Sequence, residues 1–359
     1  VRDKTPLAKH LRKALRQMKC PRDKITGKER DSDFAAQIFG FSEAASEWLL
    51  KSNQHEMHNN VLELFFESGK FLMISEIYDN HKTQFISIND KTMTLFCLDP
   101  SEIIAEALKR AKASVLFSAT LTPLPYFRET LGGNDGDTML MLPSPFDPRR
   151  FATILHTGIS TKYTDRENSY APISEAIFTA INSKKGNYLV FFPSYIYMQS
   201  VYEIFTDLYP HIETLLQTSS MTEDSRAEFL TRFDENNPQT LVGFTVLGGI
   251  FSEGIDLAGD RLIGTIIIGV GFPKISSRHD LIRDYFNEKN GDGFDYAYVF
   301  PGMNKVLQAA GRVIRTETDS GFVLLIDSRY AEQKYKNLLP AHWTNKIFIR
   351  NAKHIPALI

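Results

Sequence analysis

Three apolar runs, Tyr188-Leu-Val-Phe-Phe192, Gly264-Thr-Ile-Ile-Ile-Gly269 and Phe322-Val-Leu-Leu-Ile326, indicate the fold class of this 359-residue chain. Each run is apolar at nearly every position rather than at every second one, which requires that both faces of the strand be buried. Helical patterns separate these runs along the chain. Strands that alternate with helices and are buried on both sides predict an α/β domain, in which helices cover both faces of a parallel sheet.

The alternation extends from about residue 150 to residue 326. We expect strands at 188–192, 213–216, 240–244, 262–268 and 322–326, and helices at about 170–184, 195–208, 222–234, 277–289 and 303–316.

The first 150 residues follow a different pattern. Apolar residues recur at helical spacing through residues 1–80, as at Leu7, Leu11 and Leu15, and a polar connector interrupts them at residues 20–33. We then expect strands at 83–88 and 93–98, a helix at 101–112 capped by Ser101, a buried strand at 114–117 and a linker at 132–150.

The composition is that of an ordinary folded protein, with 41 Lys and Arg residues against 43 Asp and Glu residues and 43% hydrophobic residues. It excludes a disordered chain and a histone-like polycation. No apolar run approaches the roughly 18–20 residues of a membrane span, so no membrane partner is expected. The two cysteines, Cys20 and Cys97, exclude a disulfide scaffold and a four-cysteine metal site within this chain.

Positive charge is concentrated at the start of the chain. Residues 1–30 carry a net charge of +8, which leaves −10 for the rest. A basic stretch of this kind can follow a phosphate backbone, and a solvated helix face is the competing interpretation. The candidate contacts in this segment are Lys9, Arg12, Lys13 and Arg16.

Familiar ligand motifs are missing from the sequence. No Gly-x-x-x-x-Gly-Lys-Ser/Thr stretch occurs. Gly269-Val-Gly271 is followed by Lys274 where a dinucleotide fingerprint requires glycine, which makes a dinucleotide-dependent enzyme a poor alternative. His55 and His58 are three residues apart, whereas a zincin helix requires four. We therefore predict no metal ligands in this chain.

Loops that follow the strands are the expected ligand sites of such a sheet. Ser194 begins a helix after strand 188–192, either as a plain cap or as a helix start that binds phosphate. Residues 247–256 combine two glycines with Glu253 and Asp256. These carboxylates could accept from a ribose hydroxyl, orient a water or pair with arginines, and the glycines allow close approach of a ligand.

The helix expected at 303–316 separates its apolar and polar residues. Its apolar positions share one face, and Gln308, Arg312 and Arg315 share the other, beside Gly311. Two arginines without a nearby carboxylate on the same face favour an anion, because guanidinium groups fit phosphate oxygens. A solvated face with surface salt bridges is the alternative.

Taken in order, these loops resemble the second RecA-like motor domain of superfamily 2 helicases of the DinG/XPD type, with bacterial DinG-like proteins closer than the eukaryotic repair helicases. The resemblance covers about residues 85–345 and is carried by the strings at 115–123, 190–195, 248–257, 308–315 and 319–329, above all SEGID at 252–256 and QAAGRVIR.

The resemblance implies roles for the candidate residues. Gln308, Arg312 and Arg315 would reach ATP bound on a first motor domain, the arginines as arginine fingers on the γ-phosphate. A second set, Glu253, Gly254 and Asp256, would sense nucleotide and nucleic acid. Ser118 and Thr120 would couple the nucleotide site to DNA. Ser194 and Tyr195 would contact the nucleic-acid backbone.

The resemblance also implies a domain plan. Residues 1–82 would belong to a helical arch-like segment, 83–148 to the end of the first motor domain, and 149–359 to the second. ATP and Mg²⁺ would be bound mainly by an absent amino-terminal half, where an iron–sulfur cluster is also possible. The simplest interpretation is a carboxy-terminal half that should not hydrolyse ATP alone.

The implied activity is an ATP-dependent DNA helicase that moves 5′–3′ on single-stranded or forked DNA in repair or replication. Its partner would be the amino-terminal motor domain of the same protein, and its place the bacterial cytoplasm, associated with the nucleoid. The alternative is a non-motor nucleic-acid-binding module or a degenerate paralogue.

Overall fold

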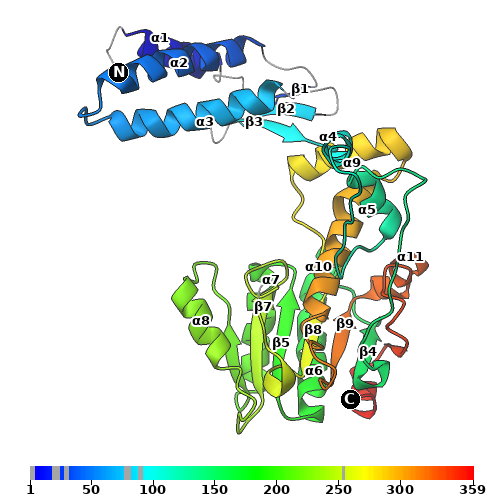
Figure 1. Ribbon diagram of the computed structural model, residues 1–359. Helices are drawn as coiled ribbons and strands as arrows, with labels where there is room; N and C mark the ends of the chain where they lie inside the picture. Colours follow the sequence, from blue (N-terminus) through cyan, green and yellow to red (C-terminus); the bar gives the residue numbers. More distant parts are fainter. Residues whose placement is uncertain (1–4, 18–24, 28–31, 77–81, 88–91, 253–254) are drawn as a thin grey trace. The chain divides into compact units, whose positions relative to one another are not determined.

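A computed structural model describes residues 5–17, 25–27, 32–76, 82–87, 92–252 and 255–359 (Figure 1). The chain divides into two units by its internal contacts. The first comprises Val1–Lys112 with Thr130–Gly132, and the second comprises Ala113–Glu129 with Gly133–Ile359.

The first unit combines four helices with a small antiparallel sheet among its described residues. The helices are α1 (Pro6–Gln17), α2 (Ser32–Lys51), α3 (His58–Glu76) and α4 (Ser101–Leu108), and the strands β1 (Ile25–Gly27), β2 (Lys82–Ser87) and β3 (Thr92–Cys97) pair in that order. Helix α1 packs on α2, and α2 packs on α3. The expected helices and the β2–β3 pair are confirmed.

Two local expectations in the first unit are wrong. The supposed connector contains β1, which pairs with β2 between Ile25 and Ile86. Ser101 is the first residue of α4 rather than its cap, and its N–H donates to Asp99 Oδ1 at 3.0 Å. An aspartate two residues upstream has therefore taken part of the role expected of the serine.

The second unit is built on a seven-stranded sheet whose strand pairs are all parallel. The order is β10–β4–β9–β8–β5–β7–β6, with bounds β4 (Phe151–His156), β5 (Asn187–Phe192), β6 (Glu213–Leu216), β7 (Leu241–Val246), β8 (Gly264–Ile268), β9 (Gly321–Ile326) and β10 (Lys346–Ile349). Because all strands run the same way, the loops that follow them gather at one edge of the sheet.

Helices cover both faces of this sheet, as the double-sided apolar runs predict (Figure 1). Val190 and Phe192 pack with α6 (Arg166–Ser183) and α7 (Tyr195–Leu208). Leu189 and Phe191, which point the other way, pack with α8 (Glu223–Thr231) and α10 (Phe300–Ala310). The predicted α/β class with a parallel sheet is confirmed.

The remaining helical segments are shorter or lie beside the sheet. They are α5 (Leu124–Thr130), α9 (Ser277–Asn290), α11 (Gln333–Lys336), a π-helical turn at Asp295–Val299 that leads into α10, and 3₁₀ turns at Pro148–Arg150, Tyr163–Asp165, Gly259–Arg261, Ser328–Ala331 and Ala352–Ala357.

The strand expected at 114–117 is absent, and two strands of the second unit were missed, in addition to β1 in the first. Val115 and Phe117 are 82% and 89% exposed in an extended stretch without strand pairing. An apolar run becomes a strand only where neighbouring strands accept its backbone hydrogen bonds. Strand β4 was missed because the buried polar residues Thr153 and His156 interrupt its apolar pattern, and β10 because it has only four residues.

Candidate functional site

The start of α7 lies at the carboxyl edge of the sheet, directly after β5. Ser194 is the N-cap of this helix, and its Oγ accepts from the Tyr197 N–H at 3.4 Å. The Tyr195 hydroxyl accepts from Gln217 Nε2 at 2.9 Å, and the Val246 N–H donates to Gln217 Oε1 at 2.8 Å. A buried glutamine thus ties Tyr195 to the end of β7.

Tyr195 lies in a groove of about 480 Å³. The groove is lined mainly by polar side chains with a few apolar ones, namely Tyr195, Ile196, Met198, Gln199, Ser200, Glu203, Leu216, Gln217, Thr218 and Ser219. Exposed hydroxyl, amide and aromatic groups around an open groove suit a ligand that carries hydrogen-bonding groups and planar rings.

The loop after β7 is folded around its own serine. Gly248 has a φ of +73°, a conformation that favours glycine, and its N–H donates to Ser252 Oγ at 2.7 Å. Phe251 and Ile255 are buried and anchor the loop to the core. Glu253 and Gly254 lie outside the described residues. Asp256 is exposed, and its carboxylate has no hydrogen bond or ion pair with a described residue.

Helix α10 ends earlier than expected, which corrects the helix predicted at 303–316. It stops at Ala310, with Gly311 as its C-cap, so Arg312 and Arg315 lie in the turns beyond it. Beyond this end, Asp319 holds the turn in which the helix was expected to continue, because its Oδ2 accepts from the N–H groups of Arg315 (2.7 Å) and Thr316 (2.8 Å). Burial alone would raise the pKa of Asp319, but these hydrogen bonds and that from the Thr316 hydroxyl hold it below its ordinary value.

Both arginines donate to backbone carbonyls of the loop after β7. Arg312 Nε donates to Ser252 O at 3.1 Å and its Nη1 to Ile255 O at 3.2 Å. Arg315 Nη2 donates to the same Ile255 O at 2.6 Å, and its Nε is buried without a partner in the structure. The predicted grouping of the two arginines therefore holds, but it arises from a shared loop rather than from one helical face.

Gln308 lies on α10 itself and shares a pocket of about 330 Å³ with Ser118 and Thr120. Asn304 lines the same pocket, and its Nδ2 donates to Thr122 O at 3.1 Å, which holds residues 118–122 against α10. Two motifs separated by about 190 positions in the sequence are thus brought together.

Lys305 is a cation of this region that the sequence analysis did not single out. It lies on α10 one turn before Gln308, and its side chain covers Gly248. Its spacing of three residues from Gln308 would have placed it on the polar side of the helix, and that was the available signal.

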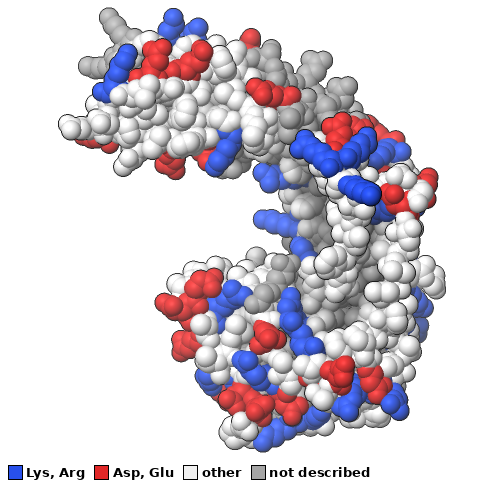
Figure 2. All heavy atoms as spheres, in the orientation of Figure 1, with Lys and Arg blue, Asp and Glu red and all other residues white. Residues whose placement is uncertain are grey.

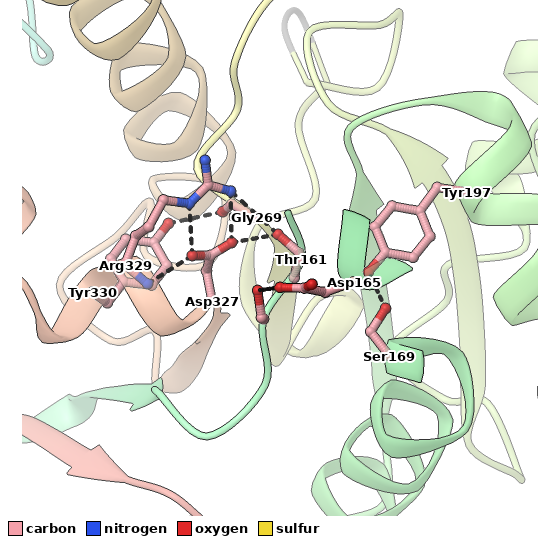
Figure 3. Close-up of polar contacts among 9 residues, drawn as sticks. Thr161, Asp165, Ser169, Tyr197, Gly269, Asp327, Arg329 and Tyr330 are labelled. Atoms are coloured by element: carbon pink, nitrogen blue, oxygen red, sulfur yellow. Dashed lines mark hydrogen bonds and ion pairs between the residues drawn. The ribbon is translucent and has the colours of Figure 1, made fainter. Parts of the chain in front are cut away.

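A polar network fastens the ends of three neighbouring strands (Figure 3). Asp327, after β9, is fully buried and receives two hydrogen bonds from the Arg329 guanidinium, from Nε and from Nη2, each at 2.8 Å. It also accepts from Thr161, after β4. The Tyr330 hydroxyl donates to the carbonyl of Gly269, after β8, at 2.9 Å.

The same view shows a second set of contacts beside this network (Figure 3). The Tyr197 and Ser169 hydroxyls are 2.5 Å apart and join α7 to α6, while Ser160 Oγ donates to Asp165 at 2.6 Å. Burial raises the pKa of Tyr197 to about 12, so this phenol stays protonated and can hold the contact.

The basic candidates of the first unit share one side of α1. Lys9, Lys13 and Arg16 are exposed and Arg12 is half-buried, whereas Ala8 and Ala14 are buried on the side that packs with α2. Helix α1 therefore presents a basic stripe to solvent.

The described part of the chain shows neither a metal-ion cluster nor a membrane-spanning helix. It contains no group of three or more His, Cys, Asp or Glu side chains arranged to hold a metal ion. Nor does any helix there combine the length and the apolar character that crossing a bilayer requires.

Comparison with known proteins gives a consistent family. Residues 177–346 match the family model for the helicase C-terminal domain. The chain is 25% identical over 345 residues to the ATP-dependent DNA helicase CHL1 of Vanderwaltozyma polyspora, a match that covers 88% of this chain and 41% of that protein. It is 31% identical over 245 residues to the ATP-dependent DNA helicase DinG of Photobacterium profundum, covering 64% of this chain and 34% of that protein.

A solved structure agrees on the fold. The structure of Xpd4 from S. tokodaii superposes with a TM-score of 0.62 at 14% identity, over 97% of this chain and 66% of that one. At this identity the similarity concerns the fold alone. The chain spans well under half the length of the curated relatives it matches.

Proposed function

We propose that the chain is the carboxy-terminal part of an ATP-dependent DNA helicase of the superfamily 2 DinG/XPD type, since residues 177–346 match the helicase C-terminal domain and the chain is similar to the CHL1 and DinG helicases. The helicase couples ATP hydrolysis to translocation on single-stranded DNA. We propose 5′–3′ movement, a role in repair or replication, and a place in the bacterial cytoplasm in association with the nucleoid.

One observation carries this proposal: residues 118–120, the loop after β7 and the end of α10 meet on one side of the second unit. Gln308 shares a pocket with Ser118 and Thr120, while Arg312 and Arg315 hold the carbonyls of Ser252 and Ile255. A group that contacts nucleotide can thus transmit its position to a loop close to Tyr195 through Gln217. Such continuity is what a motor that couples the two ligands requires.

The arginines act as arginine fingers on the γ-phosphate of ATP bound to an amino-terminal motor domain, and Gln308 contacts the same nucleotide. The loop carbonyls of Ser252 and Ile255 hold the guanidinium groups before ATP arrives. Phosphate oxygens are stronger partners for guanidinium than neutral carbonyls, so the guanidinium groups leave the loop carbonyls for the γ-phosphate when ATP is bound. Glu253, Gly254 and Asp256 belong to the same loop and respond when the arginines change partner from the loop carbonyls to the phosphate.

The amino-terminal motor domain is the proposed partner within the protein, and it binds most of the ATP and Mg²⁺. An iron–sulfur cluster, where present, belongs to that domain too. The exposed apolar residues Val115, Phe117, Leu140 and Leu142 fit this proposal, because strands of a preceding motor domain would cover them. Ser194 and Tyr195 contact single-stranded or forked DNA at the groove beside α7.

The test uses a protein in which this chain follows its amino-terminal motor domain. Arg312→Ala and Arg315→Ala should each lower DNA-stimulated ATP turnover by about 10³-fold or more, since arginine fingers contribute about that factor. Binding of a fluorescent ATP analogue should persist. Arg350→Ala, at an exposed arginine outside the site, is the matched control.

Wild-type turnover by both variants would refute the finger assignment. The 359-residue chain alone should show no ATP turnover with or without DNA, and a DNA-stimulated rate from it would contradict the proposed division of labour.

A further inference from the structure

Lys305 is a half-buried cation that lies against the backbone of the loop after β7. A Cβ atom added to Gly248 would meet Lys305 Cδ at 3.1 Å and Nζ at 3.4 Å, so the glycine leaves room for the lysine side chain. Lys305 makes no ion pair or hydrogen bond with a residue that the structure describes. A positioned ammonium group that has no acidic partner among the described residues can accept an anion from solution at little cost.

On the side of α9, Lys305 has polar surroundings that include one carboxylate, Asp280, which is already paired with Arg283 at 3.0 Å. His279, in the first turn of α9, has Nδ1 2.9 Å from Ser276 Oγ. Burial first and the charge of Lys305 second lower the pKa of His279, against the opposing effect of Asp280. Hydroxyl and imidazole groups next to a cation are suitable partners for phosphate oxygens.

A row of hydrogen-bonding groups connects Lys305 to the groove at Tyr195. Gly249 follows Gly248, and a Cβ atom there would lie 3.3 Å from Gln217 Nε2. The same Nε2 donates to the Tyr195 hydroxyl. The one acidic side chain that lines the groove, Glu203, already accepts from Gln199 at 2.9 Å. The row runs along the ends of β5 and β7, where it can follow a polymer.

The Lys305 side chain lies against Gly248, one helical turn from Gln308. The pocket of Gln308, Ser118 and Thr120 does not include it among its lining residues, although it belongs to the same helix. Its ammonium group faces Gly248 instead, on the side of Gln217 and Tyr195. The geometry therefore favours a phosphate of the nucleic-acid backbone over a phosphate of the nucleotide.

We propose that Lys305 binds a backbone phosphate of single-stranded nucleic acid over Gly248, as the cationic end of a strand path that begins at Tyr195. The proposal rests on the proposed function, because it assumes that the chain binds nucleic acid. It adds a contact residue that lies outside the recurring helicase strings of this sequence.

The experiment measures binding of a fluorescein-labelled oligothymidylate to the 359-residue chain by anisotropy, over a series of salt concentrations. One phosphate contact contributes about 0.7 to the slope of log K against log salt on single strands, which corresponds to about fivefold in affinity between 1 M and 0.1 M salt. Lys305→Ala should flatten the slope by about 0.7 and weaken binding about fivefold at 0.1 M salt.

Two further variants make the result specific. Lys305→Arg should keep the slope, because it retains the charge. Lys185→Ala removes an exposed lysine at the opposite, amino end of β5 and should leave the slope unchanged. A fluorescent ATP analogue, titrated against a protein in which this chain follows its amino-terminal motor domain, should bind equally well with and without Lys305→Ala.

The outcomes distinguish a failure of the Lys305 assignment from a failure of the proposed function. If the unmodified chain binds oligothymidylate and Lys305→Ala keeps its slope, the assignment of Lys305 is wrong. An effect of Lys305→Ala on the ATP analogue alone would place the phosphate on the nucleotide and also overturn it. If the unmodified chain does not bind the oligonucleotide at all, the proposed function fails first.

Discussion

Single residues determine how firmly the carboxyl edge of the sheet is held. The Asp327 carboxylate is fully buried, and Arg329 keeps only 14% of its side-chain surface. Burial alone would lower the pKa of Arg329, but Asp327 outweighs it and holds the pKa above its ordinary value. The Arg329 guanidinium also lies 4.8 Å over the ring of Phe272, so it is fixed from two sides.

Removal of Asp327 should therefore be strongly destabilising. Asp327→Ala leaves the Arg329 charge buried without its partner and Thr161 without its acceptor, which costs about 3–5 kcal/mol. Urea unfolding followed by circular dichroism measures this loss. Asp135→Ala breaks an exposed pair with Arg128 and should cost no more than about 1 kcal/mol. Equal losses in the two variants would show that the buried network does not stabilise the edge.

Among the elements, α1 has the clearest separation of buried and charged sides. Ala8 and Ala14 face the packed side, and Lys9, Lys13 and Arg16 are exposed. The pattern alone could not distinguish a nucleic-acid contact from a solvated helix. The structure shows that the stripe is accessible, and its ligand stays a prediction.

Neutralising this stripe tests it at the level of the element. Replacing Lys9, Arg12, Lys13 and Arg16 with glutamine should flatten the salt slope of oligothymidylate binding by up to about 3, at roughly 0.7 per contact. Glutamine preserves helix propensity, so the helix should remain intact by circular dichroism. A double variant of Lys184 and Lys185, at the amino edge of the sheet, is the comparison. A slope equal to that of the unmodified chain would identify the stripe as solvated surface.

Over the whole molecule, charges of both signs are interspersed on the visible surface of the second unit (Figure 2). Histidines that are partly or fully withdrawn from water make stability depend on pH. Burial lowers the pKa of His156, His279 and His342 from the ordinary value of 6.5. The unfolded chain therefore binds more protons than the folded one as the pH falls through 6.5. The free energy of unfolding must then decrease in the same direction.

We expect the free energy of unfolding to be nearly constant above about pH 7.5 and to decline towards pH 5.5, before the carboxylates begin to titrate. Denaturant titrations across this range measure the decline. His156→Asn should reduce it, because the amide oxygen can accept from the Gly158 N–H as Nδ1 does, without binding a proton. A decline of unchanged size in this variant would exclude His156 as a source.

The class of the sheet and the positions of most of its strands and helices could be predicted from the sequence alone. Apolar runs such as Leu189–Phe192 can be recognised as strands in the sequence, because burial on both faces excludes polar residues from every position. The strings around Ser252 and Gln308 identified the family for a similar reason, since they are local. Strand β4 could not be recognised from the sequence, because the buried polar residues Thr153 and His156 break its apolar pattern.

The directions of the functional side chains depend on contacts between residues that are far apart in the sequence. Helix α10 ends before Arg312, Asp319 holds the turn at Arg315, and the carbonyls of Ser252 and Ile255 accept from both arginines. The position of Lys305 over Gly248 likewise depends on a loop more than fifty residues away. Hydrogen bonds and charges act through space over a few ångströms, whatever the distance along the chain, so sequence spacing cannot assign these partners.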